Sequence, residues 1–206
     1  MLANYAGGDQ AIFNELAAVS GFVAAEQRFL VDSPLIGGAT PDFGPLWVQI
    51  LGRPATAEFF AEIDRLYNVT GLEHLVPIGD PADVLAGLRR GGYRLGIATN
   101  DAEAGTHAQI ARLGLAHLVE FVAGHDSGFG AKPAAGPVLA FARAVEVAAH
   151  EVAMVGDEIH DIAAARAAGA VALGVRSGPV PGELLAPHAD ALIDSIAELP
   201  AWLEQR

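Results

Sequence analysis

The stretch "VGDEIHDIAAARAAG" (residues 155–169) decides the fold, because a short apolar segment runs into Gly-Asp and then into an alanine-rich segment. Residues 151–155 predict a buried strand, and residues 159–168 predict a helix. Asp157 then lies where the strand gives way to the helix, and Asp161 lies about one helical turn later. Open α/β sheets bind ligands at the carboxyl ends of their strands, so the two carboxylates mark a candidate site.

A purely structural role for the same two carboxylates is an equal alternative while the stretch is taken alone. Asp157 can cap the helix by accepting hydrogen bonds from backbone N–H groups. Asp161 can be an exposed charge in the first turn, where the helix dipole favours an anion. The rest of the chain has to decide between the two interpretations.

Composition limits the classes of protein that fit. The chain has 206 residues, 52% of them hydrophobic, with a formal net charge of −13 and no cysteine. Such an acidic chain is a poor partner for nucleic acid, and the absence of cysteine excludes thiol catalysis and disulfides. No apolar run is long enough to span a membrane, and the amino-terminal segment lacks the pattern of a signal peptide. We therefore expect a cytoplasmic protein with no nucleic-acid or membrane partner.

Two regions differ in pattern, and they predict two domains. Residues 1–75 have apolar residues at helical spacing and Gly- or Pro-bearing breaks, and we expect helices and no strand there. Residues 76–206 alternate helical segments with short apolar segments, which predicts βαβ units and a parallel sheet. Strands are expected at residues 93–99, 120–124, 151–155, 170–175 and 191–194.

Polar residues gather where three of these strands end. Thr99 and Asn100 close one strand, Lys132 lies in the loop after the next, and Asp157 and Asp161 follow a third. Each group alone fits turn chemistry or a solvated charge. Because right-handed crossovers bring the carboxyl ends of parallel strands to one edge, their joint placement favours one site. A hydroxyl, a lysine and paired carboxylates suit a phosphoryl group with Mg²⁺.

Three motifs carry a resemblance to a known family. "LGIATND", "GAKPAAGP" and "VGDEIHDIAAARAAGA" resemble, in order and spacing, motifs of the haloacid dehalogenase-like hydrolase superfamily, in particular its phosphoglycolate phosphatase-like branch. The resemblance covers residues 76–195. It implies a Rossmann-like parallel sheet with a small helical cap at residues 1–75. It also implies a Mg²⁺-dependent phosphatase acting on a small phosphorylated metabolite.

The resemblance also implies roles for single residues. Thr99 and Asn100 would hold the phosphoryl group, and Lys132 would orient the nucleophile and the phosphate. Asp157 would bind Mg²⁺, and Asp161 would be a second metal ligand or a support for one. Lys132 and Asp157 would therefore be the catalytic residues of this chain.

The first motif of the family is missing. That motif is an apolar strand ending in Asp-x-Asp, which supplies the nucleophile, and the sequence contains no Asp-x-Asp. In the family the strand lies in the middle of the sheet, so we expect a sheet without its first, central strand and a chain that is inactive as written. Asp80 and Asp126 are poor substitutes. Three explanations stay open. The start codon is assigned too late or the chain is truncated, the chain is a pseudoenzyme, or another chain supplies the strand.

Two other functions compete with the phosphatase. A non-catalytic protein that binds a phosphometabolite or a metal would keep the pocket and lack turnover. A nucleotide-binding Rossmann domain is disfavoured, because no predicted strand is followed by Gly-x-Gly-x-x-Gly. Loss of the central strand would also leave exposed sheet edges, through which the chain could self-associate.

Overall fold

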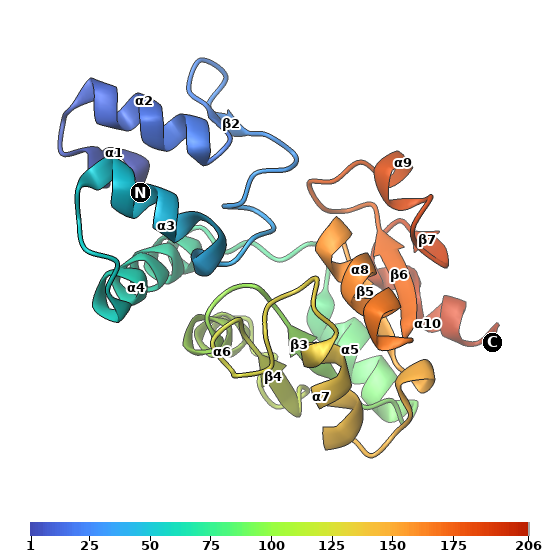
Figure 1. Ribbon diagram of the computed structural model, residues 1–206. Helices are drawn as coiled ribbons and strands as arrows, with labels where there is room; N and C mark the ends of the chain where they lie inside the picture. Colours follow the sequence, from blue (N-terminus) through green and yellow to red (C-terminus); the bar gives the residue numbers. More distant parts are fainter. Residues whose placement is uncertain (206) are drawn as a thin grey trace. The chain divides into compact units, whose positions relative to one another are not determined.

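The computed structural model describes residues 1–205, and the chain divides into two compact units, one from Met1 to His74 and one from Leu75 to Arg206. Figure 1 shows the helices and strands of both units along the chain. No helix within residues 1–205 combines the length and the apolar character that crossing a membrane would need.

The first unit is mainly helical and encloses its own core. Trp47, Leu16 and Ile63 are fully buried at its centre. The Trp47 indole Nε1 donates a hydrogen bond of 3.0 Å to the Ser20 hydroxyl, so the polar atom of this buried ring is satisfied. The elements are α1 (Leu2–Ala6), α2 (Gln10–Val19), β1 (Phe22–Val23), β2 (Arg28–Phe29), α3 (Thr40–Leu51) and α4 (Ala57–Glu73).

A short hairpin in this unit corrects the expectation that it contains no strand. β1 and β2 pair antiparallel, with Phe22 opposite Phe29 and their ring centroids 5.0 Å apart. Gln27 closes the turn with a φ of 50°, in the left-handed region. Each strand has two residues, too few to leave an alternating pattern, so the hairpin gave no periodic signal.

The second unit has the expected α/β class. β3 pairs parallel with β4, and β5, β6 and β7 form a second parallel sheet in that order. The strands are β3 (Gly96–Ala98), β4 (Phe121–Ala123), β5 (Ala153–Gly156), β6 (Val171–Val175) and β7 (Ala191–Ile193). The helices are α5 (Pro81–Arg90), α6 (Glu103–Arg112), α7 (Gly136–Ala144), η1 (Ala149–Glu151), α8 (Ile159–Ala168), α9 (Gly182–Leu185), η2 (Ile196–Glu198) and α10 (Leu199–Leu203).

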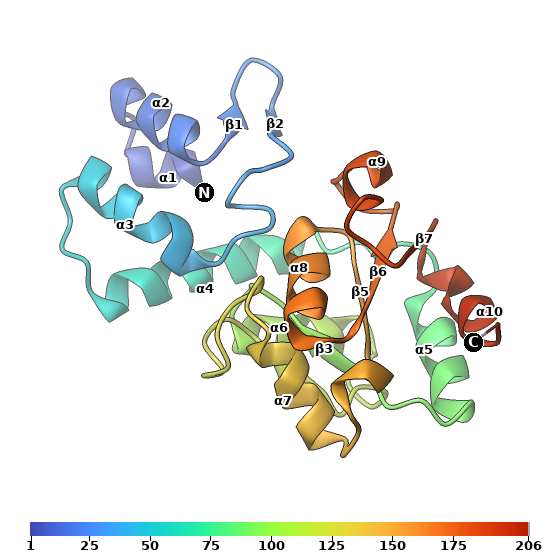
Figure 2. The same ribbon diagram turned by 45° about the vertical axis from the view of Figure 1, so that its right-hand side comes forward.

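Helices cover both faces of the β5–β7 sheet. Successive side chains of a strand point to opposite faces, and β6 separates two clusters in this way. Ala172 packs with Ile162 of α8 on one face, whereas Leu173 packs with Leu88 of α5 and Leu199 of α10 on the other. Figure 2 shows the strands between these two helical layers. Because both faces are covered, β6 is apolar along its length.

The two sheets stand apart, because no ladder joins β3 to β5 among the described residues. Four of the five residues of β6 are buried, but Gly96 of β3 is exposed and the rest of β3 is only half-buried. β3 is also shorter than the strand expected at residues 93–99. The strand expected from residue 151 starts at Ala153, because η1 occupies residues 149–151.

Removal of a buried side chain from β6 tests this core. Leu173→Ala should lower the free energy of unfolding by about 2–5 kcal/mol, because Leu173 is fully buried between the sheet and its helices. Leu184, a leucine of the same unit, is 53% exposed, and Leu184→Ala should change the free energy of unfolding by less than about 0.5 kcal/mol. Urea denaturation measures both values, and equal losses would contradict the assigned core.

Candidate functional site

A buried ion pair lies at the centre of the candidate site. The Lys132 ammonium donates a 2.6 Å hydrogen bond to Asp161 Oδ1. The two side chains are 12% and 4% exposed, respectively. Lys132 is the single lysine of the sequence and lies in the loop between β4 and α7, whereas Asp161 lies in the first turn of α8. The pair therefore joins segments that follow strands of the two separate sheets.

Asn100 fixes the main chain of the lysine. Its side-chain Nδ2 donates to the Lys132 carbonyl at 2.9 Å, and its Oδ1 accepts from the Lys132 backbone N–H at 2.8 Å. Asn100 is 8% exposed, and one residue, Thr99, separates it from the end of β3. The Asn100 side-chain amide is thus hydrogen bonded to the Lys132 main chain, and the role in holding a phosphoryl group that the resemblance implied for Asn100 stays a prediction. Asn100 is therefore a positioning residue for the lysine.

Asp161 also organises the start of α8. Its Oδ2 accepts a 3.0 Å hydrogen bond from the Glu158 backbone N–H, as a capping side chain does. Gly156 makes room for this carboxylate, because a Cβ at that position would lie 2.1 Å from Asp161 Oδ2. Both carboxylate oxygens of Asp161 thus have protein donors. Neither structural alternative describes these residues: Glu158 rather than Asp157 occupies the N-cap position, and Asp161 is buried rather than an exposed charge.

Two carboxyl groups beside the ion pair are hard to ionise. Burial, and then the negative charge of Asp161, raise the pKa of Asp157, although Lys132 opposes the shift. Burial and the charges of Asp157 and Asp161 raise the pKa of Glu158 to about 7. Within residues 1–205, the buried Glu158 Oε1 has no hydrogen-bond partner. Carboxyl groups held in this way would be stabilised by a bound cation.

The remaining sequence candidates have local roles. The Thr99 hydroxyl accepts a 3.0 Å hydrogen bond from the Asp101 N–H. Asp126 accepts from the backbone N–H of Glu103, the first residue of α6, and Asp80 caps α5. Asp80 and Asp126, the poor substitutes for the nucleophile, thus each accept a hydrogen bond from a backbone N–H at the start of a helix.

The described residues do not complete a Mg²⁺ site. They contain no group of three or more His, Cys, Asp or Glu side chains arranged to hold a metal. Mg²⁺ needs near-octahedral oxygen coordination, and both oxygens of Asp161 already accept hydrogen bonds. The Asp157 carboxylate packs so closely on Gly178 that a Cβ at that glycine would lie 1.9 Å from Oδ2. A metal ligand role for Asp157 and Asp161 stays a prediction.

Sequence reasoning missed Glu158 and Gly178. Glu158 lies inside the stretch that marked the site, but nothing in its spacing shows that its carboxyl oxygen is buried. Gly178 lies in the loop after β6, far along the chain, and only the folded structure shows that it touches Asp157. A common cleft lined by Thr99, Lys132 and Asp157 also stays a prediction.

Comparison with known proteins gives a family match. The profile of the haloacid dehalogenase-like hydrolases matches residues 47–175. The chain is 42% identical over 120 residues to a phosphoglycolate phosphatase of Cupriavidus necator, covering 58% of this chain and 52% of that protein. It is 33% identical over 163 residues to a phosphoglycolate phosphatase of Chromobacterium violaceum, covering 73% and 72%. The chain thus spans about half the length of the Cupriavidus protein.

A solved structure shares the fold. A family hydrolase from Deinococcus radiodurans, crystallised with bound phosphate and sodium, superposes with a TM-score of 0.67 at 20% identity. The superposition covers 100% of this chain and 90% of the other. At this identity the likeness establishes the Rossmann-like fold and carries no information on activity.

Loss of the anionic partner of Lys132 should destabilise the chain. Asp161→Asn keeps the shape but leaves a buried ammonium without its counter-charge, which should cost about 3–5 kcal/mol of unfolding free energy. Asp194 pairs with Arg176 at side-chain exposures of 73% and 50%, so Asp194→Asn should cost at most about 1 kcal/mol. Urea denaturation compares the two variants. Similar small losses would show that the Lys132–Asp161 pair is well solvated.

The raised pKa of Glu158 predicts a pH dependence. Because this pKa rises from its usual 4.5 to about 7, ionisation of Glu158 opposes folding. Its effect on stability is absent below about pH 4.5, grows as the pH rises through 7, and is complete above that value. Glu158→Gln should therefore melt progressively higher than the parent chain between pH 5 and pH 8, measured by thermal denaturation with a chelator present. Glu183→Gln, at an exposed position, is the control, and a constant offset for Glu158→Gln would contradict the prediction.

Proposed function

We propose that this chain, which belongs to the haloacid dehalogenase-like hydrolase family, serves the hydrolysis of phosphate monoesters of small metabolites with Mg²⁺. The observation that carries the proposal is the buried Lys132–Asp161 pair, with Asn100 clamping the main chain of the lysine. A cation held this firmly at the carboxyl end of a parallel sheet is suited to an anionic substrate. The names of curated relatives make phosphoglycolate the first substrate to test.

Each residue of the site has a distinct part in this proposal. Lys132 presents a fixed positive charge to phosphate oxygens, and its pairing with Asp161 limits where that charge can lie. Thr99 offers a hydroxyl at the end of β3. Asp157 contributes a carboxylate to Mg²⁺, which when bound would neutralise phosphate charge. Asp161 acts through Lys132 and through the start of α8, as a positioning residue.

One component of the reaction is not supplied by residues 1–206. Phosphoryl transfer through an aspartyl intermediate needs a carboxylate in line with the leaving group. The resemblance to the family assigns that carboxylate to an Asp-x-Asp segment, and the sequence has none. We therefore propose that residues 1–206 bind the phosphoryl group weakly and turn over only when such a segment is supplied.

A non-catalytic role is the second candidate. The Asn100–Lys132–Asp161 arrangement is built in full without the nucleophile, and it would hold an anion without transforming it. A cytoplasmic phosphometabolite-binding protein needs no more than this. Turnover by a chain that includes an Asp-x-Asp segment separates the two candidates.

A hydrolysis assay tests the proposed function. Residues 1–206 should hydrolyse p-nitrophenyl phosphate and phosphoglycolate with Mg²⁺ no faster than the Lys132→Ala and Asp157→Asn variants. A chain extended upstream by an apolar strand with Asp-x-Asp should show Mg²⁺-dependent turnover, which each substitution lowers at least about 100-fold. Arg112→Ala and Asp83→Asn, both at exposed positions, are the matched controls and should keep full activity.

Two outcomes would overturn this assignment. Mg²⁺-dependent turnover by residues 1–206 alone would show that a carboxylate within them is the nucleophile. An extended chain that binds phosphate but never hydrolyses an ester would favour the non-catalytic role.

A further inference from the structure

We infer that Glu103 and Ser127 are positioning residues for Lys132, because they hold the start of the loop that carries the lysine. This loop runs from Gly124 to Lys132, between β4 and α7. Asn100 holds its end, and the beginning of α6 holds its start. The inference rests on the proposed function only in taking Lys132 as the cation that faces the phosphate.

The Ser127 side chain links the start of the loop to α6. Its hydroxyl donates a hydrogen bond to Glu103 Oε2 and accepts one of 2.9 Å from the Gly124 N–H. The Ser127 N–H donates to the Gly124 carbonyl at 3.2 Å, which closes a tight turn over residues 124–127. In return, Asp126 Oδ1 of the same turn accepts a 2.8 Å hydrogen bond from the Glu103 N–H. Glu103 is therefore bonded to the turn through both its side chain and its main chain.

Main-chain contacts bring the same turn against the segment that follows β3. The His125 N–H donates to the Asp101 carbonyl at 3.1 Å. Gly124 fits there because it has no side chain. A Cβ on Gly124 would lie 2.3 Å from the Glu103 nitrogen and 2.6 Å from the Asp101 carbonyl oxygen. The start of the loop therefore lies directly on residues 101–103.

Both ends of the loop are thus held by one short segment. Asn100 binds the Lys132 main chain through two hydrogen bonds, of 2.9 and 2.8 Å. Three residues further on, Glu103 binds the turn at the start of the loop. Because residues 100–103 carry both anchors, the two ends of the loop keep a fixed separation. Release of the start would leave the lysine main chain held at the Asn100 end alone.

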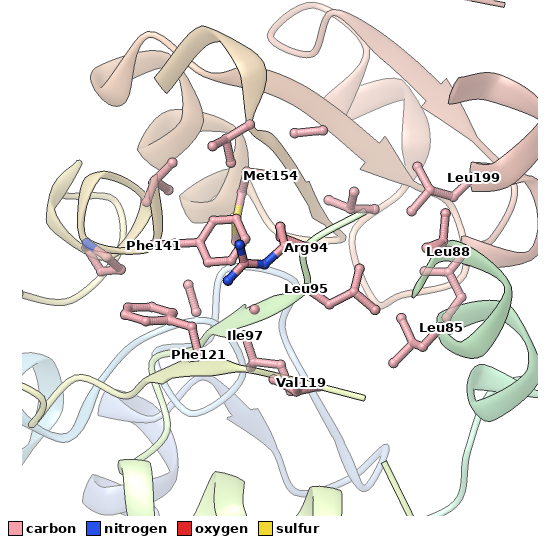
Figure 3. Close-up of a pocket in the computed structure, with 18 residues that line it drawn as sticks. Leu85, Leu88, Arg94, Leu95, Ile97, Val119, Phe121, Phe141, Met154 and Leu199 are labelled. Atoms are coloured by element: carbon pink, nitrogen blue, oxygen red, sulfur yellow. The ribbon is translucent and has the colours of Figure 1, made fainter. Parts of the chain in front are cut away.

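The middle of the loop can change conformation once an end is released. Gly128 and Gly130 have φ values of 82° and 83°, a region that glycine reaches without steric cost, and they are free of side chains that would restrict other conformations. Phe129 lies between them and packs on Phe121, with ring centroids 5.9 Å apart, although Phe129 stays partly exposed. Phe121 in turn lines an apolar cavity of about 280 Å³ (Figure 3). The hydrogen-bonded ends therefore decide where Lys132 lies.

Chemical labelling of Lys132 tests the inference, because Lys132 is the single lysine of residues 1–206. Its side chain is 12% exposed and paired with Asp161, so an N-hydroxysuccinimide ester should acylate it slowly in the parent chain. Faster labelling requires a local opening of the loop. The amine of Met1 belongs to the other unit and serves as the internal reference. Mass spectrometry of proteolytic fragments measures both rates.

Variants of the two positioning residues should raise the labelling rate of Lys132. Ser127→Ala removes both hydrogen bonds of the hydroxyl. It should raise the rate about tenfold relative to the Met1 amine, because one of the lost hydrogen bonds is to a charged group. Glu103→Gln keeps an acceptor without the charge and should raise the rate less. Ser127→Thr keeps the hydroxyl and should label like the parent chain.

Ser195→Ala is the matched control. It also removes a side-chain hydrogen bond, which the Ser195 hydroxyl accepts from the Ala197 N–H at 3.2 Å at the start of η2. It should leave the labelling rate of Lys132 unchanged, even where it lowers the melting temperature as much as Ser127→Ala does. A Ser127 side chain that only added stability would give the two alanine variants the same labelling rate.

Two results would overturn the inference. Labelling of Ser127→Ala at the parent rate would show that Asn100 is sufficient to hold the lysine. An equal rise in Ser127→Ala and Ser195→Ala would assign the effect to a general loss of stability. If Ser127→Ala fails to fold, Glu103→Gln decides the question by the same measurement.

Inorganic phosphate separates this inference from the proposed function. Phosphate bound at Lys132 should slow labelling of the parent chain. A parent chain whose labelling rate is the same with and without phosphate would contradict the proposed function. The comparison of Ser127→Ala with Ser195→Ala contains no phosphate, so it decides the role of Ser127 in either case.

Discussion

The Lys132–Asp161 ion pair is the interaction on which the site depends. A buried ammonium must keep its counter-charge, because an unpaired charge in this environment costs several kcal/mol. The pair therefore constrains the loop after β4 and the first turn of α8 to stay together. Within residues 1–205 no ladder joins the two sheets, so side-chain contacts connect them: this ion pair, the packing of α7 against α8 and β3, and the packing of α5, whose Leu85 belongs to the apolar clusters of both sheets.

The pKa values of the carboxyl groups beside the ion pair depend first on burial and then on the surrounding charges. Lys132 and the Glu158 N–H use both oxygens of Asp161, so the lysine neutralises that carboxylate more than the others. Burial, and then the negative charge of Asp161, raise the pKa of Asp157, and burial followed by the charges of Asp157 and Asp161 raises the pKa of Glu158. Two carboxyl groups with raised pKa values, Asp157 and Glu158, therefore lie beside each other after β5. A cation bound there would lower the pKa of both groups.

Sequence patterns predicted the parts of the structure that rest on local periodicity. Residues 159–168 form α8 as expected, and the alternation of helices and strands after residue 76 gave the parallel α/β class. Patterns failed where partners are distant in sequence or elements are too short. The pairing of Asn100 with the Lys132 main chain spans 32 residues and needs tertiary contact, and the hairpin at Phe22 has too few residues for a period.

The length and flexibility of the lysine side chain matter for how the two sheets are linked at the site. An ammonium on a four-carbon stem can follow its partner through small shifts, whereas a planar guanidinium requires a fixed orientation. Asn100 holds the main chain of Lys132 to the β3 side, and Asp161 belongs to the β5 side, so the stem is the adjustable link between them. Lys132 is thus the residue through which a backbone contact on the β3 side reaches a buried carboxylate on the β5 side.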